Sequence, residues 1–159
     1  MQKYIAYIFL SFLILPISSQ EDLWDVIREN SNFQYSADRL EIQKALKIYK
    51  NNQYLVDRLS KNGQRYLYHM VTETLERDMP VELALLPFVE SQFDPYAQSP
   101  AGASGIWQFI LSTAKEQGLK RNWWYDGRRD IIASTNSALN YLDSMYQKTN
   151  DWSLAIASF

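Results

Sequence analysis

Residues 81–90 read VELALLPFVE, and this segment is the main indication of the fold that we expect. This segment is nearly all apolar, so it predicts a helix buried at the centre of the domain. Pro80 precedes it and suits a first helical position, where the missing N–H group of proline costs nothing. Glu90 ends the stretch on the same helical face as Leu83 and Leu86, which makes it an unusual place for a carboxylate.

Helical patterns also dominate the rest of the chain. No stretch alternates apolar and polar residues in the way that predicts a strand. The other helices that we expect span residues 21–30, 38–50, 54–59, 64–77, 106–118, 130–147 and 152–159. The stretch 93–105 is rich in Pro, Ser and Gly, so it predicts a loop. The sequence therefore predicts an all-α fold.

The composition narrows the classes of function. A chain of 159 residues fits one domain with a small appendage. The formal net charge of -2 gives no electrostatic footprint for nucleic acid, so we expect no nucleic-acid partner. The chain has no cysteine, and His69 is its one histidine. This excludes disulfides, cysteine nucleophiles, thiolate metal sites and multi-histidine metal sites.

The first 20 residues predict an export signal. Lys3 precedes a short apolar run over residues 5–17, and the small residues Ser18 and Ser19 close it. A cationic start, a short apolar region and small residues in this order are typical of a secretory signal peptide. A membrane-spanning helix needs about 20 apolar residues, although an uncleaved anchor stays open. We expect the mature protein to work outside the cytoplasm.

Glu90 is the candidate catalytic group. A carboxylate on an apolar helical face is partly desolvated, which disfavours its charged form and raises its pKa. A carboxylic acid that stays protonated near neutral pH can act as a general acid. The alternative is that Glu90 merely sits where the helix emerges into water.

The segment after this helix suits a bulky polar substrate. Small side chains in residues 99–105 let the backbone approach a ligand closely. Gln108 offers a donor and an acceptor for sugar hydroxyl and acetamido groups. Flat apolar faces that could stack on sugar rings come from Trp107, Trp123 and Trp124. For any one of these tryptophans, a place in the core is the simpler interpretation.

The other acids near the candidate site have a structural interpretation. Asp126 and Asp130 lie beside Arg128 and Arg129 in the sequence, which predicts a cluster of ion pairs rather than a second catalytic carboxylate. His69 shares a helix with apolar neighbours, so we expect it to pack locally.

Four motifs together resemble a known family. Residues 84–95 (ALLPFVESQFDP) and 103–109 (ASGIWQF) look like the lytic murein transglycosylases of the soluble-lytic type, glycoside hydrolase family 23. Residues 122–130 (NWWYDGRRD) and 151–155 (DWSLA) narrow the resemblance to the membrane-bound type D subgroup. The resemblance covers residues 22–159. It implies a goose-lysozyme-like helical fold, peptidoglycan glycan strands as substrate, and non-hydrolytic cleavage that leaves 1,6-anhydro-N-acetylmuramic acid ends.

The resemblance also implies roles for single residues. Glu90 matches the family's one catalytic acid and base, and Ser99 and Gln108 match positions close to the substrate. Ile110 matches a cleft-lining position that is often methionine. Phe159 stands where the family has a tyrosine that approaches the glutamate, although phenylalanine lacks the hydroxyl group. The expected substrate-binding set is therefore Ser99, Gln108, Ile110 and Phe159, together with Trp107 of the motif at residues 103–109.

A single carboxylate suffices for this reaction, whereas most glycosidases use two. The substrate's acetamido oxygen would stabilise the developing cation, and Glu90 would protonate the leaving oxygen and then accept the proton of the C6 hydroxyl group. We therefore expect no metal ion and no organic cofactor. Two alternatives stay open: a hydrolytic muramidase on the same fold, and a non-catalytic module that binds peptidoglycan. The sequence leaves the oligomeric state unknown.

We expect three regions along the chain. Residues 1–20 form the signal peptide, residues 21–62 a helical extension, and residues 63–159 the lysozyme-like transglycosylase domain. The last helix ends on an apolar turn without a stop signal, so we expect that domain to be incomplete at its C-terminus. The location that fits is the periplasm or the cell envelope, in association with the membrane or the wall, without a lipobox cysteine as a tether.

Overall fold

The computed structural model describes residues 22–32 and 39–159, and the expected signal peptide lies outside them. The named elements in this part are all helical: α1 Leu23–Glu29, α2 Leu40–Lys50, α3 Gln53–Gly63, α4 Leu67–Leu75, the 3-10 helix η1 Val81–Leu85, α5 Leu86–Ser91, α6 Leu111–Glu116, α7 Ile131–Thr149 and α8 Trp152–Ala157. Over these ranges β-structure is confined to isolated bridges. The expected all-α fold class is confirmed. None of the helices described here is long and apolar enough to cross a bilayer.

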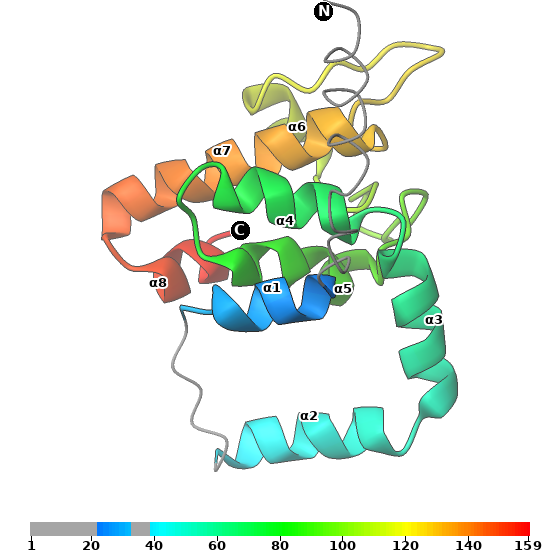
Figure 1. Cartoon of the computed structure of the whole chain (residues 1–159). Helices are drawn as coiled ribbons and strands as arrows, with labels where there is room; N and C mark the ends of the chain where they lie inside the picture. The colour runs from blue at the N-terminus through cyan, green and yellow to red at the C-terminus, as the bar shows by residue number, and fades with distance from the viewer. Residues whose placement is uncertain (1–21, 33–38) are drawn as a thin grey trace, which may run out of the picture.

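The core forms where α4 meets η1 and α7 (Figure 1). Its fully buried side chains include Met70 of α4, Leu83 of η1, and Leu139 and Leu142 of α7. Their burial follows the helical spacing of apolar residues in each segment. The stretch 81–90 therefore begins at the centre of the molecule, as expected.

That stretch is nevertheless two elements rather than one α-helix. Residues 81–85 wind as a 3-10 helix, and α5 starts afresh with Pro87 in its first turn. Proline has no N–H group to donate to a carbonyl one turn earlier, so a continuous α-helical ladder cannot pass through this position. The short α5 then leaves the core, and Val89 is 77% exposed.

The expected helix over residues 106–118 is wrong in its first part, because α6 begins only at Leu111. The preceding residues form a tight turn in which the Ser104 N–H group donates to the Phe109 carbonyl at 3.0 Å. Gly105 has a φ of +86°, and a Cβ atom there would lie 1.7 Å from a backbone oxygen of the segment before α7. Glycine alone permits this conformation and this close approach.

Helices α2 and α3 form an arm that extends from the rest of the molecule (Figure 1). No residue of α2 is buried. The arm rejoins the body where Leu59 and Gly63 of α3 are buried. A hollow of about 1200 Å³ lies between the arm and the body, and its lining includes Leu46, Leu67 and Phe88.

Candidate active site

Glu90 lies in the last turn of α5 and faces away from the core. Successive residues of an α-helix are about 100° apart, so Phe88 and Glu90 lie on opposite faces. Phe88 packs against the core cluster and lines the hollow beneath the arm. Glu90, like Val89 beside it, is exposed.

The surroundings of Glu90 favour its neutral form. Neighbouring atoms exclude part of its water, and this desolvation raises the pKa of Glu90 above its ordinary value. Among the residues that the structure describes, no cation forms an ion pair with it. An acid of this kind can hand a proton to a substrate that reaches the exposed end of α5.

Hydrogen bonds from two distant segments fix the end of α5. Gln92 caps the helix in the left-handed conformation, with a φ of +56°. Asn62 of α3 donates its amide N–H to the Gln92 carbonyl at 3.0 Å, and the Arg58 guanidinium group donates to Gln92 Oε1. On the other side, Ser91 Oγ donates to the Ile106 carbonyl at 2.7 Å. The orientation of Glu90 therefore depends on α3 and on the turn before α6.

Ser99 and Gln108 lie in the loops that follow α5, and both side chains are half-buried. Ser99 Oγ accepts the Ala103 N–H group at 3.1 Å. Gln108 Nε2 donates to the carbonyl groups of Ala97 at 3.2 Å and Gly105 at 2.8 Å. Both side chains thus hold the loop of small residues in shape, which is also the loop that was expected to receive a substrate.

The structure separates Trp107 from the other expected site residues. Its side chain has no exposed surface, and its indole N–H group donates to Thr135 Oγ1 at 3.0 Å. Such a side chain offers no face to a sugar ring, so it belongs to the core. Phe159 packs edge-on against Trp107 and Phe109, with ring centroids 6.0 and 5.7 Å apart. Ile110, in contrast, is 44% exposed at the N-terminal end of α6.

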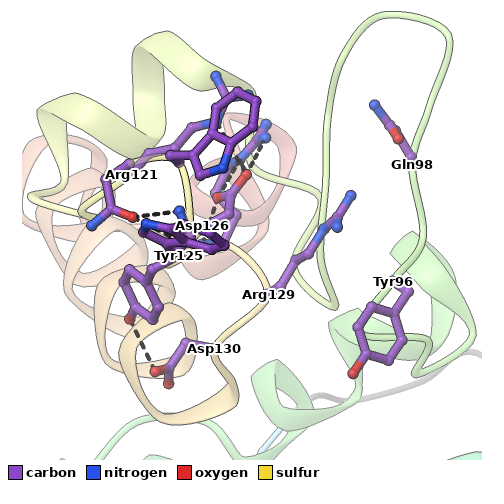
Figure 2. A pocket seen from close by; sticks show the side chains of 11 residues that line it. Tyr96, Gln98, Arg121, Tyr125, Asp126, Arg129 and Asp130 are labelled. Atoms are coloured by element: carbon purple, nitrogen blue, oxygen red, sulfur yellow. Dashed lines mark hydrogen bonds and ion pairs between the residues drawn. The ribbon is translucent and has the colours of Figure 1, made fainter.

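A polar pocket of about 490 Å³ lies between the loop after α5 and the segment before α7 (Figure 2). Asp126 is its central acid and forms an ion pair of 2.6 Å with Arg128, with Arg121 at 3.5 Å. The hydrogen bonds from Arg128 lower the pKa of Asp126, and the charge of Arg121 adds to this effect. The Asp126 carboxylate is therefore ionised, and the nearby arginines balance its negative charge, as expected of a structural ion pair.

Asp130 has a different structural role. Its Oδ1 accepts the Ala133 N–H group at 2.9 Å and thereby caps α7, while Tyr125 donates its hydroxyl to Oδ2 at 2.9 Å. The Ala133 N–H bond is the main cause that lowers the pKa of Asp130. Arg129 takes no part in this cluster, since its one described side-chain bond is donated by Nε to Ser104 Oγ at 3.1 Å.

Three residues of interest were not found by sequence reasoning. Arg58 and Asn62 lie about 30 positions before Gln92, and no local pattern connects them with α5. Arg129 was assigned to the ion pairs because it lies beside Asp126 and Asp130 in the sequence. Glu90 itself lines neither the hollow beneath the arm nor the polar pocket.

Comparison with known proteins gives consistent matches. The transglycosylase SLT domain matches residues 67–159. The chain is 41% identical over 145 residues to the membrane-bound lytic murein transglycosylase D of Escherichia coli strain K12, which covers 90% of this chain and 32% of that protein. The corresponding protein of Escherichia coli O6:H1 matches equally well. Membrane-bound lytic murein transglycosylase F of Shewanella pealeana is 34% identical over 70 residues, covering 44% of this chain and 13% of that protein. The chain spans about a third of the length of the first two relatives.

Proposed function

Because this chain belongs to the transglycosylase SLT domain family, we propose that it is a lytic transglycosylase that cleaves peptidoglycan in the cell envelope. The observation that carries the proposal is Glu90: an exposed carboxyl group at the end of α5, with a raised pKa and no ion-pair partner among the described residues. The names of the relatives, which describe murein transglycosylases, support the same substrate. Their description as membrane-bound supports a location at the membrane.

The proposed reaction uses Glu90 twice. The protonated carboxyl group first donates its proton to the glycosidic oxygen between N-acetylmuramic acid and N-acetylglucosamine. As the C1–O bond breaks, the acetamido oxygen of the muramic acid bonds to C1 and takes up the developing positive charge. The Glu90 carboxylate then accepts the proton of the C6 hydroxyl group, whose oxygen bonds to C1 and displaces the acetamido oxygen. The product has a 1,6-anhydro end, Glu90 is protonated again, and no water is consumed.

We assign the substrate-binding roles to residues near this end of α5. Ser99 and Gln108 shape the loop of small residues, and Ile110 exposes an apolar side chain beside it. The Ser91 bond to Ile106 couples this loop region to α5. Phe159 acts indirectly, by packing against the aromatic core residues beneath the loop.

Replacement of Glu90 tests the proposal. The variant Glu90→Gln keeps the size of the side chain but can neither release nor accept the proton, so we expect cleavage of purified peptidoglycan to fall by about 10²–10⁴-fold or more. Glu76→Gln, at the exposed end of α4, is the matched control and should cleave at the wild-type rate. Chromatography with mass spectrometry of the released fragments measures both the rate and the product.

The same product analysis separates the two alternatives. Anhydro ends support the transglycosylase, whereas reducing ends from the wild-type chain would mean a hydrolytic muramidase. Binding of peptidoglycan without any released fragment would mean a binding module. Cleavage by Glu90→Gln at the wild-type rate would mean that another carboxyl group is the acid.

A further inference from the structure

Aromatic side chains gather around the polar pocket and are unusually exposed. Trp123 and Trp124 are 87% and 90% exposed, and Tyr96 across the pocket is 73% exposed. Burial of such large apolar side chains normally stabilises a fold, so these exposed side chains forgo that stabilisation. The two indole rings stand edge to face, with centroids 6.4 Å apart and planes at 86°, so they present faces in two directions.

The loop that carries the two tryptophans is held in one shape. Asn122 Oδ1 accepts the N–H groups of both Trp124 and Tyr125 at 2.8 Å, and the Asn122 N–H group donates to the Tyr125 carbonyl at 2.8 Å. An isolated bridge joins Arg121 to Asp126 at the base of this turn. The exposed rings are therefore displayed on an ordered turn, which reduces the entropy lost when a ligand binds.

Arg129 supplies a positive charge to the pocket. Figure 2 shows its side chain between the segment that holds Asp126 and the loop that holds Tyr96 and Gln98. Both carboxylates of the pocket have other partners, as described above, and in the described part of the chain Arg129 makes no ion pair. An exposed guanidinium group of this kind can pair with a carboxylate of a ligand through two parallel hydrogen bonds.

Together these features indicate which chemical groups a ligand of the pocket would carry. Flat aromatic faces suit sugar rings, the side-chain amide of Gln98 suits their acetamido groups, and Arg129 suits a nearby carboxylate. Peptidoglycan combines these groups, because each muramic acid carries a lactyl group that is joined to a peptide with free carboxylates. We propose that the polar pocket is a second peptidoglycan-binding site, in which Trp123 and Trp124 contact the sugars and Arg129 binds a carboxylate of the muramyl peptide. This inference rests on the proposed function for its substrate class.

Binding of defined fragments to the full chain tests the site. The probes are the disaccharide tetrapeptide N-acetylglucosaminyl-N-acetylmuramyl-tetrapeptide, uncharged chitotetraose, and the free tetrapeptide. The Glu90→Gln background prevents turnover, and the indole N–H signals in NMR titrations report binding. We expect Arg129→Gln to weaken binding of the disaccharide tetrapeptide by about tenfold and to leave chitotetraose unchanged. Arg129→Lys should restore part of the loss, because it keeps the charge.

The aromatic half of the site has its own variants. Trp123→Ala and Trp124→Ala should each weaken both sugar-containing probes severalfold. Arg39→Gln, an exposed arginine before α2, is the matched control and should bind as the parent does. Because these side chains are exposed, the variants should keep the parent's circular dichroism spectrum.

Two results would overturn the second site. One is unchanged binding of all probes by the Arg129 and tryptophan variants. The other is binding of the free tetrapeptide as tightly as the disaccharide tetrapeptide, with no effect of the tryptophan variants, which would indicate a site for acidic peptides. Failure of the proposed function is distinguishable from both, because it appears as the absence of anhydro products from the chain with Glu90 intact.

Discussion

Glu90 must do two opposite things in the proposed reaction, since it first gives up a proton and then accepts one. The partial loss of water that raises its pKa helps the first step and destabilises the ionised form. Because the side chain is still exposed, solvent screens most of this effect. Desolvation of the ionised Glu90 side chain thus lowers the stability of the folded state slightly, and such perturbed groups are common at functional sites.

This cost predicts how stability depends on pH. The folded state holds the Glu90 proton to a higher pH than the unfolded chain, whose pKa is close to the ordinary value of 4.5. The stability contributed by the protonated group is therefore fully present below about pH 4.5 and is lost as the pH rises through the folded-state pKa. Glu90→Gln has no such loss, so we expect it to have a slightly higher Tm than the wild type at pH 7 and the same Tm at pH 4.

Thermal unfolding followed by circular dichroism at the two pH values measures this difference. Glu76→Gln serves as the control here too and should show no gain at pH 7. A gain for Glu90→Gln of equal size at both pH values would contradict the desolvation argument.

The sequence predicted the acids of the site better than its aromatic residues. Asp126 and Asp130 were both expected in ion pairs because arginines lie beside them. Asp126 forms the ion pair with Arg128, whereas Asp130 forms none among the described residues and instead caps α7. From the sequence, Trp107 and Trp123 are equally good candidates for stacking on a sugar ring. In the structure Trp107 is fully buried, whereas Trp123 is almost fully exposed. Residues in turns have no periodic pattern of apolar positions from which the direction of a side chain could be predicted. This difference therefore arises from tertiary packing.

The turn that precedes α6 is the element on which the candidate site depends. It carries Gln108, it accepts the hydrogen bond from Ser91, and it packs closely against the segment before α7. Gly105 makes that close approach possible. Gly102, three residues earlier, has a similar φ of +84°, but a Cβ atom there would meet nothing within 4 Å.

This pair of glycines gives a matched comparison. Both Gly102→Ala and Gly105→Ala force alanine into the left-handed region, which costs about 1–2 kcal/mol. Gly105→Ala adds a clash with backbone, so we expect it to destabilise the protein by more than about 4 kcal/mol in total. Urea unfolding of the two variants measures both values. Equal losses of stability would contradict the close packing of this turn.

Element boundaries were predicted less well than element types. The apolar residues of the turn before α6 looked like a helical face, because a short apolar run has no period that separates a buried turn from a buried helix. In residues 81–90 the change from η1 to α5 follows from Pro87, whose effect was foreseeable from the sequence. The long α7, with a capping aspartate and many apolar positions, was predicted within two residues of its observed end.

The whole molecule combines a packed body with a loosely held arm. Fully buried side chains concentrate in α4, η1 and α7, whereas α2 contributes none. Helices with few buried contacts open locally at little cost, while those in the core open only with global unfolding.

Hydrogen exchange should therefore differ strongly between these elements. We expect the amides of α2 to exchange through local opening, and those of the middle of α7 to require an opening free energy of about 5 kcal/mol or more. Mass spectrometry of peptides from the exchanged protein resolves the two helices. Protection of α2 equal to that of α7 would mean that the arm is part of the cooperative core.

The hydrogen bonds from α3 to Gln92 have a consequence for anyone who would transplant this domain. The matched family segment starts at residue 67, but Arg58 and Asn62 lie before it. A fragment excised at that boundary would keep Glu90 and lose two of the donors that hold the cap of its helix. The unit to transfer is thus one helix longer than the matched family segment, and a chimera that omits α3 would lack these two donors at the end of the helix that carries the proposed acid.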